Sequence, residues 1–208
     1  MKQLLTAAAL ACAFMVPANN VWAKCTYEHP AKTLIQTTTK KVLDALSTNS
    51  ANTEDVLKQH VVPNFDWKKM SRWVLGKRQW RNATSEQKDR FIEAFESLII
   101  RTYKTSLKQA AGVDFEVEYL RMCAKNLDRR VTVKARVKQG GKKFAVNFKM
   151  HNRMYNKDKK MSEGDKWEAY NVIAEGVSLL LNYRNEFKGV GIEDAITQIQ
   201  SKNQAAQP

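Results

Sequence analysis

The chain has 208 residues and a formal net charge of +14, because 35 Lys and Arg residues outnumber 21 Asp and Glu residues. This length suits one domain of ordinary size, and the basic excess indicates either an anionic partner or a solvated basic surface with no single partner. Because the N-terminus resembles an export signal, the expected anions are phospholipid headgroups, lipopolysaccharide phosphates and acidic protein surfaces, and nucleic acid is not expected as a partner.

The first residues have the pattern of a secretory signal. Lys2 supplies a positive start, residues 4–16 form a mostly apolar core, and Pro17 interrupts it. The motif VWA then permits cleavage, which defines a signal peptide of residues 1–23. A membrane anchor is the competing interpretation, but spanning a bilayer needs about 20 apolar residues and this run is shorter. We therefore predict one periplasmic domain of residues 24–208, soluble and monomeric.

Two cysteines, Cys25 and Cys123, remain after cleavage at that point. An oxidising compartment favours a disulfide between such a pair, because only one connectivity exists. We predict this bridge as a structural staple and not as a catalytic pair.

The N-terminal half of the mature chain is predicted to be helical. Residues 31–46 carry an apolar stripe, and a shorter helix over residues 53–62 is stopped by the proline that follows. The segment NFDWKKMSRWVLG predicts a third helix, with Asn64 or Asp66 as its capping residue and Gly76 as its stop.

The longest predicted helix begins at TSEQ. Thr84 and Gln87, three residues apart, form a capping box at its start, and the helix is expected to end near Gly112. Its apolar residues recur at helical spacing and make one wide stripe. They are Phe91, Phe95, Leu98, Ile99, Tyr103 and Leu107.

After this helix the apolar period changes to two. The segments DFEVEYL, RRVTVKARVK and KFAVNFKM alternate apolar with polar residues, and Gln139–Lys142 predicts a hairpin between the last two. Trp167–Ile173 predicts a fourth strand. A helix through about Phe187, a final helix and a short disordered tail from Ser201 complete the predicted elements.

Helices followed by antiparallel strands indicate an α+β fold. Each predicted strand has one apolar and one polar face, so the sheet covers something on one side only. We therefore expect the N-terminal helices to pack against a curved, mainly antiparallel four-stranded sheet.

No catalytic motif is present in the sequence. His29, His60 and His151 are isolated from one another, so no metal site is predicted. Glu175 is the best candidate for a catalytic carboxylate. It would act as the general base of an exported enzyme on a small apolar substrate. The alternative is that Glu175 and Gly176 only shape the corner between a strand and a helix, since glycine permits unusual backbone angles. We favour the corner and predict no catalytic residue.

Two sequence motifs closely resemble motifs of the MlaC family, also called the toluene-tolerance auxiliary family, and they occur in the same order. The first runs from VVPNFDW to the long helix, and the second is KWEAYNVIAEGVSLLLNYRNEF. The residues that carry the resemblance are Pro63, Phe65, Asp66, Leu75, Gly76, Trp80, Gln87, Phe91, Trp167, Glu175–Ser178, Asn182–Arg184 and Phe187.

The resemblance implies a periplasmic carrier of glycerophospholipid. Such a carrier moves lipid between an outer-membrane lipoprotein complex and an inner-membrane ABC transporter with an MCE-domain subunit, and so maintains outer-membrane lipid asymmetry. The implied fold is a nuclear-transport-factor-2-like roll with extra helices that encloses an apolar cavity. The implied ligand is a bound phospholipid as cargo, with no other cofactor.

Apolar residues from the long helix, the strands and the corner are then expected to contact the acyl chains. They are Leu75, Phe91, Phe95, Leu98, Val131, Val133, Phe144, Val146, Phe148 and Val177. The alternative is that these side chains pack against one another in a filled core. Basic residues between Trp67 and Arg81, or on the polar strand faces, are expected to meet acidic partner or membrane surfaces.

Overall fold

The computed structural model describes five segments of the chain. They are residues 28–47, 52–111, 115–122, 129–155 and 166–205. The predicted signal peptide lies outside these segments, as do Cys25 and Cys123 and therefore the predicted disulfide. Within the described segments, no helix is both long enough and apolar enough to cross a membrane.

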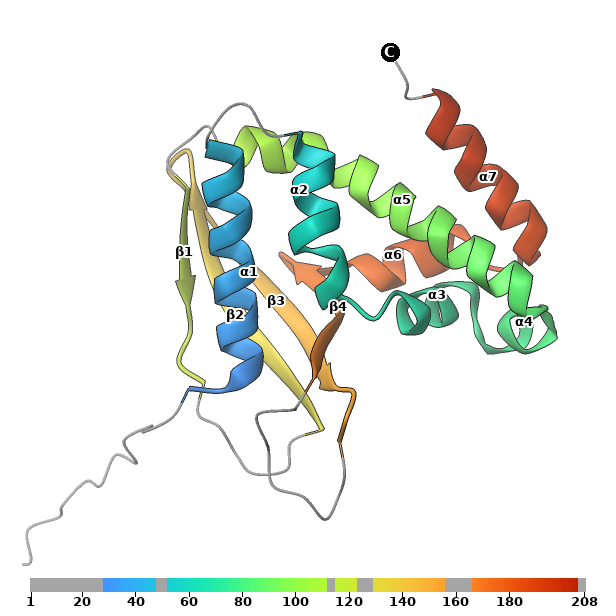
Figure 1. Ribbon diagram of the computed structural model, residues 1–208, viewed down its shortest axis with the longest axis horizontal. Helices are drawn as coiled ribbons and strands as arrows, with labels where there is room; N and C mark the ends of the chain where they lie inside the picture. The colour runs from blue at the N-terminus through green and yellow to red at the C-terminus, as the bar shows by residue number, and fades with distance from the viewer. Residues whose placement is uncertain (1–27, 48–51, 112–114, 123–128, 156–165, 206–208) are drawn as a thin grey trace, which may run out of the picture.

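Helices form the N-terminal half of the described chain, as the sequence predicts (Figure 1). They are α1 (Pro30–Ser47), α2 (Thr53–His60), the short 3₁₀ helix η1 (Val62–Asn64), α3 (Trp67–Leu75), α4 (Lys77–Asn82) and α5 (Ser85–Ala111). The sequence pattern does not predict α4, because this short helix follows α3 after a single residue and is too brief to show a period.

Polar side chains and one glycine set the helix boundaries. The Asp66 carboxylate accepts a hydrogen bond from the Lys69 N–H at 2.9 Å and so caps the start of α3, and Gly76, with φ 86°, ends this helix. At the start of α5, the Gln87 N–H donates to the Thr84 hydroxyl at 3.1 Å and the Thr84 N–H donates to the Gln87 side chain at 2.9 Å. The predicted capping box is therefore confirmed.

The sheet is antiparallel throughout and has the strand order β1-β2-β3-β4-β5. Its strands are β1 (Phe115–Tyr119), β2 (Arg130–Gln139), β3 (Lys142–Asn152), β4 (Trp167–Ala174) and β5 (Val177–Ser178). The prediction of four strands was therefore wrong by one. Strand β5 is too short to show an alternating pattern, so sequence periodicity cannot reveal it.

Two tight turns connect the strands at one end of the sheet. Gly140 and Gly141 link β2 to β3 with φ of 54° and 75°, as the predicted hairpin requires. Glu175 and Gly176 link β4 to β5 with φ of 48° and 80°. The Glu175 N–H donates to the Ala145 carbonyl at 2.9 Å, and the Glu175 carboxylate accepts from the Ala145 N–H. Glu175 and Gly176 thus form a β-turn that precedes the last strand.

Two helices follow the sheet, α6 (Leu179–Glu186) and α7 (Ile192–Ala205). The Ser178 hydroxyl caps α6 by accepting from the Leu181 N–H at 3.3 Å. Helix α7 lies along α5 (Figure 1) and continues to Ala205, into the segment that we predicted to be disordered from Ser201.

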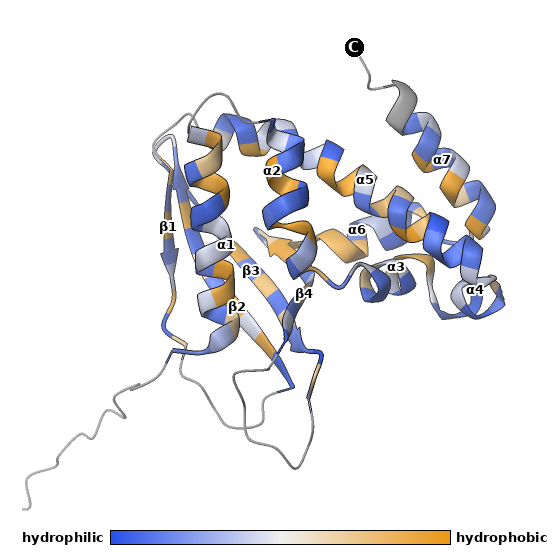
Figure 2. Cartoon of the chain, in the orientation of Figure 1, coloured by the Kyte–Doolittle hydropathy of each residue, from blue (hydrophilic) through white to orange (hydrophobic). Residues whose placement is uncertain are grey.

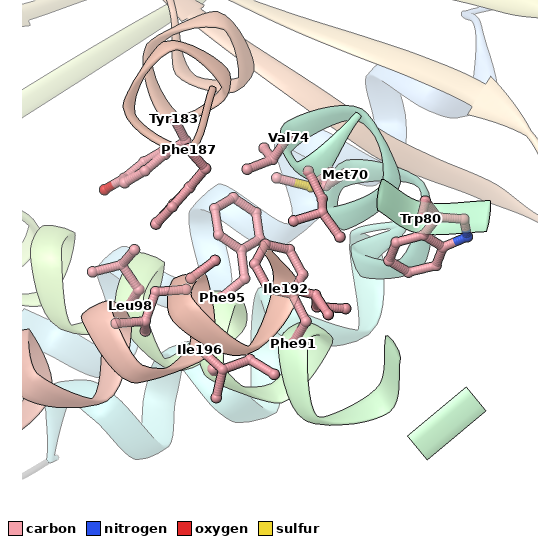
Figure 3. Packing of buried hydrophobic residues seen from close by; sticks show 14 of the residues in the cluster. Met70, Val74, Trp80, Phe91, Phe95, Leu98, Tyr183, Phe187, Ile192 and Ile196 are labelled. Atoms are coloured by element: carbon pink, nitrogen blue, oxygen red, sulfur yellow. The ribbon is translucent and has the colours of Figure 1, made fainter. Parts of the chain in front are cut away.

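Apolar and polar residues alternate along α5 and α7 (Figure 2), and their apolar sides meet in a helical core. This core joins α3, α4, the first part of α5, α6 and α7, with Phe91, Phe95 and Phe187 packed at its centre (Figure 3). A second cluster packs the start of α1 against the sheet around Val133 and Met150. A third cluster joins α1, α2 and α5.

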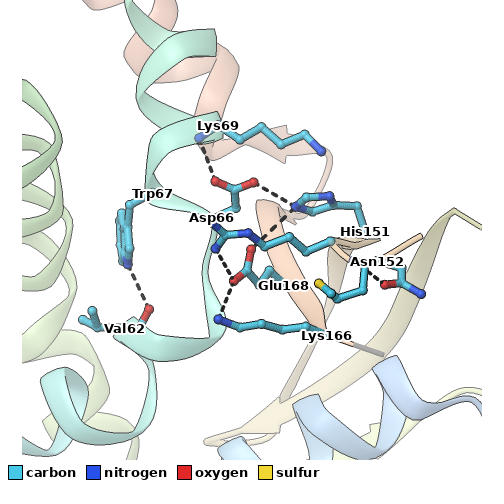
Figure 4. Close-up of polar contacts among 10 residues, drawn as sticks. Val62, Asp66, Trp67, Lys69, His151, Asn152, Lys166 and Glu168 are labelled. Carbon is cyan, nitrogen blue, oxygen red and sulfur yellow. Dashed lines mark hydrogen bonds and ion pairs between the residues drawn. The ribbon is translucent and has the colours of Figure 1, made fainter. Parts of the chain in front are cut away.

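Asp66 connects the helical core to the sheet (Figure 4). Its N–H donates to the Ala169 carbonyl of β4 at 2.9 Å, beside a parallel bridge between Phe65 and Ala169. One carboxylate oxygen caps α3, and the other lies 2.9 Å from Nε2 of His151 on β3. Burial disfavours the charged form, but His151 and the Lys69 N–H outweigh it and hold the Asp66 pKa below its ordinary value.

Replacement of Asp66 tests this connection. Asp66→Ala should lower the free energy of unfolding by about 1 kcal/mol or more at neutral pH, because the cap is lost together with the His151 contact. Asp66→Asn should lose less, since asparagine also caps helices.

The Asp66 pKa is lower in the folded state than in the unfolded state, so the ionised carboxylate stabilises the fold at pH values above the ordinary pKa of about 3.9. This stabilisation is lost as the pH falls through the folded-state pKa. Urea unfolding followed from neutral to acidic pH should therefore show the gap between wild type and Asp66→Asn narrowing below about pH 4. A gap that stays constant would contradict this role.

Candidate functional site

A cavity of about 500 Å³ lies between the inner face of the sheet and helices α1, α2 and α5. This volume falls within the range of about 300–1,000 Å³ that is typical of small-molecule sites. None of the described residues that line the cavity carries a charge. The cavity is therefore suited to an apolar ligand.

The sheet supplies one wall because every second residue of a strand points to the same face. Pairing between strands places Val146 of β3 opposite Ala135 of β2 and Ala174 of β4, so three small apolar side chains form a row. The sheet residues that line the cavity are Phe115, Val117, Tyr119, Ala135, Val137, Gln139, Phe144, Val146, Phe148, Val172, Ala174 and Val177.

The helices supply the opposite wall at helical spacing. The apolar residues of this wall are Ile35, Val42 and Leu43 on α1, Leu57 on α2, and Ile99, Ile100 and Leu107 on α5. Val61, Val62 and Phe65, between α2 and α3, complete it together with Trp67 at the start of α3.

The inner polar groups of the cavity bond to one another. The Tyr119 hydroxyl donates to Thr39 Oγ1 at 2.7 Å, and the Asn64 amide donates to Thr38 Oγ1 at 3.0 Å. Burial raises the pKa of Tyr119, so this hydroxyl stays neutral at physiological pH. The Trp67 N–H donates to the Val62 carbonyl at 3.0 Å. These internal bonds leave the walls with apolar character.

The mouth of the cavity is marked by the lining residues that are exposed to solvent. Tyr103 and Ser106 on α5 are exposed on one side, and Ala174, Val177 and Asn182 are exposed on the other. The Val177 side chain is 65% exposed although it lines an apolar cavity. The cavity therefore opens between α5 and the segment that runs from the end of β4 into α6.

Leu181, next to Asn182, is also 58% exposed, so apolar side chains gather at this rim. Burial and the neighbouring Tyr183 raise the pKa of Tyr103, which keeps its hydroxyl protonated at the rim.

Four of the ten residues predicted to contact acyl chains line the cavity, namely Phe144, Val146, Phe148 and Val177. The other six lie elsewhere. Leu75, Phe91, Phe95 and Leu98 belong to the helical core, Val133 belongs to the second cluster, and Val131 packs against that cluster. These six side chains pack in apolar clusters and do not line the cavity.

The sequence prediction omitted most of the helical wall. The stripe on α5 is continuous, but its first part faces α6 and α7 while Ile99, Ile100 and Leu107 face the cavity. The stripe on α1 was the available signal for Ile35, Val42 and Leu43, although a stripe alone does not show whether it borders a core or a cavity.

Glu175 does not line the cavity. Its side chain is exposed and its carboxylate is engaged by the Ala145 N–H across the turn. A general base must lie within reach of the bound substrate. Glu175 does not occupy such a position relative to the cavity.

Outside the cavity, Asp66, His151 and Glu168 place three potential metal ligands within 4.8 Å of one another. However, Glu168 already lies 3.2 Å from both Arg153 and Lys166 (Figure 4). These cations would oppose a divalent ion, so we assign the three residues to the junction between α3 and the sheet.

The fold has been seen before in a phospholipid-binding protein from Ralstonia solanacearum, solved in complex with a phospholipid. The two structures superpose with a TM-score of 0.71 at 24% sequence identity, over 84% of this chain and 97% of the other. This likeness establishes the mixed fold of helices and an antiparallel sheet. A comparison with curated proteins gave no match.

The family comparison also covers most of the sequence. The model of the family described as MlaC protein matches residues 34–201. This range includes every described helix and strand apart from the start of α1 and the end of α7. The motifs around Asp66 and Gly176 that suggested this family both fall within the match. This chain belongs to the MlaC family.

Proposed function

We propose that this protein is a phospholipid carrier that holds the acyl chains of a glycerophospholipid in the cavity between the sheet and helices α1, α2 and α5. The observation that carries the proposal is an uncharged, apolar cavity that opens at one corner of the fold. Membership of the MlaC family and the phospholipid bound to the Ralstonia protein support it.

The physical requirement on such a carrier is severe. Each buried methylene is worth about 0.8 kcal/mol, so two acyl chains exposed to water would cost on the order of 20 kcal/mol or more. A protein can take a lipid out of a bilayer only if its own interior is comparably apolar. The facing walls around Val146 and Ile99 meet that requirement.

The exposed rim suits the headgroup. Tyr103, Ser106 and Asn182 offer hydroxyl and amide groups at the mouth, where water also reaches the ligand. The acyl chains would extend inward, toward the paired Tyr119 and Thr39. In this arrangement the charged phosphate never enters the apolar interior, which avoids a large desolvation cost.

The cellular role follows the family. We propose that the protein works in the periplasm as a monomer, after removal of residues 1–23. It would move glycerophospholipid between an outer-membrane lipoprotein complex and an inner-membrane ABC transporter with an MCE-domain subunit, and so maintain outer-membrane lipid asymmetry. The sequence contains no phosphate-binding loop for a nucleotide, so a partner would supply any energy for extraction.

Two matched substitutions test the cavity. Val146→Glu places a carboxylate on the cavity wall, where water can enter through the mouth, so the fold should persist and bound phospholipid should be lost. Val133→Glu makes the same change at a side chain that is 1% exposed and packed in the second cluster, and it should destabilise the fold by about 3–5 kcal/mol. Protein purified from a bacterial periplasm without detergent should be compared by urea unfolding and by mass spectrometry of extracted lipid.

Wild-type protein that contains no phospholipid and takes none from vesicles would overturn the proposal. So would a folded Val146→Glu variant that retains as much lipid as wild type.

Glu175→Gln separates the carrier from an enzyme. Glutamine can still accept from the Ala145 N–H, so the turn and the lipid content should both remain as in wild type. Thermal unfolding and lipid extraction measure these two properties. Bound lipid that is chemically converted by wild type and left intact by Glu175→Gln would instead favour Glu175 as a general base.

A further inference from the structure

The face of the sheet that points away from the cavity carries a dense set of cations. The helices α1, α2 and α5 all lie on the other side (Figure 1). Because side chains alternate along a strand, the cavity-lining positions of β2 and β3 leave the intervening residues on this outer face. We define the outer basic face as Arg130, Lys134, Arg136 and Lys138 on β2 and Lys143 and Lys149 on β3.

Strand register brings these cations close together. Lys138 lies directly opposite Lys143, although like charges in that relation destabilise a sheet. Acids on β1 balance part of the set, since Glu116 lies 2.7 Å from Lys138 and Glu118 lies 3.5 Å from Arg136. The face as a whole stays positive, because its six cations outnumber the carboxylates that the strands bring to it, Glu116 and Glu118 on β1 and Glu168 on β4. Glu168 lies 3.2 Å from both Arg153 and Lys166.

The other four cations have no such balance. Within the described segments, no carboxylate lies within ion-pair distance of Arg130, Lys134, Lys143 or Lys149. The Lys149 amine donates to the neutral Thr132 hydroxyl at 3.0 Å. Their charges therefore remain available to an external anion.

Further cations lie near the start of β2. Burial, followed by the charge of Arg130, lowers the pKa of Lys69 to about 8, and Arg129 acts in the same direction. The Lys69 amine lies 4.2 Å from the centre of the Tyr170 ring. Lys69, near the start of α3, therefore lies within reach of the charges of Arg129 and Arg130, together with the carboxylates of Asp66 and Glu168.

We propose that the outer basic face is a docking surface for an acidic surface of another protein. Strand pairing fixes the spacing of its cations, so it can match a defined set of carboxylates and speed association. The inference extends beyond lipid binding and does not require that the cavity hold a phospholipid.

A protein fits this face better than a bilayer does. Peripheral membrane surfaces combine basic residues with apolar side chains that enter the lipid. The large apolar side chains that are exposed in the described segments are Trp73, Tyr103, Met154, Val177 and Leu181, and none of them lies on β2 or β3. A partner held on the outer face would also leave the mouth at Val177 unobstructed.

The test compares two triple variants that change the net charge equally. Lys134→Glu, Lys143→Glu and Lys149→Glu reverse the outer basic face, and Lys77→Glu, Arg78→Glu and Arg81→Glu reverse the exposed cations of α4. Poly-L-glutamate serves as the acidic protein probe, with affinity measured by NMR titration of labelled protein. The triple variant of the outer basic face should bind poly-L-glutamate about tenfold or more weakly, with a flatter salt dependence. The triple variant of α4 should change the affinity by less than about threefold. In the wild-type protein, the chemical-shift changes on titration should be concentrated on β2 and β3.

A second probe separates a bilayer from a protein partner. Vesicles of about three parts phosphatidylcholine to one part phosphatidylglycerol should bind both triples equally. If the outer triple alone loses vesicle binding, or if both triples lose poly-L-glutamate binding equally, the proposal is overturned. If a triple variant with glutamate does not fold, the triple variants with glutamine at the same positions are compared instead. The lipid content of the outer triple should match wild type, so a failure here is distinct from a failure of the carrier proposal.

Discussion

The sheet has one apolar face, and the helices that cover it do not fill the space beneath them. Val133 and Met150 close one end of this face against α1, and α2 and α5 hold each other through Leu57 and Ile100. Between these contacts the walls remain apart and enclose the cavity. Apolar surface in contact with water costs roughly 25 cal/mol per Å², so the walls favour an apolar occupant. The cavity and its mouth exist because the helices do not fill the space over the apolar face of the sheet. The proposed binding of acyl chains depends on this space.

Stability and ligand binding are located in different parts of the molecule. The helical core around Phe91 and Phe187 is filled and lies beside the sheet, so it needs nothing from the cavity. Asp66 joins this core to the sheet through the Ala169 carbonyl and His151. The fold can therefore keep an open cavity at one side because a packed core holds the other. The charged groups follow the same division, since the cations of β2 and β3 occupy the face that the cavity does not use.

Sequence periodicity predicted the elements that are long enough to show it. The capping box at Thr84 and the hairpin at Gly140 are local patterns, and both appear in the structure. Helix α4 and strand β5 were missed because they are short. The cavity was harder to predict, because Phe95 and Ile99 share one stripe on α5 but face a packed core and a cavity respectively. Periodicity shows that a face is buried, whereas only the tertiary arrangement shows what lies against it.

The central claim is that acyl chains lie between the sheet and the helices, and paramagnetic NMR tests it most directly. Protein loaded with a phospholipid that carries a nitroxide on one acyl chain should lose methyl signal near the label. We predict that Ile99, Val146 and Val172, which line the cavity, are broadened strongly, while Val74 and Ile196 in the helical core are affected much less. Broadening of the core methyls instead, or of surface residues alone, would contradict the account.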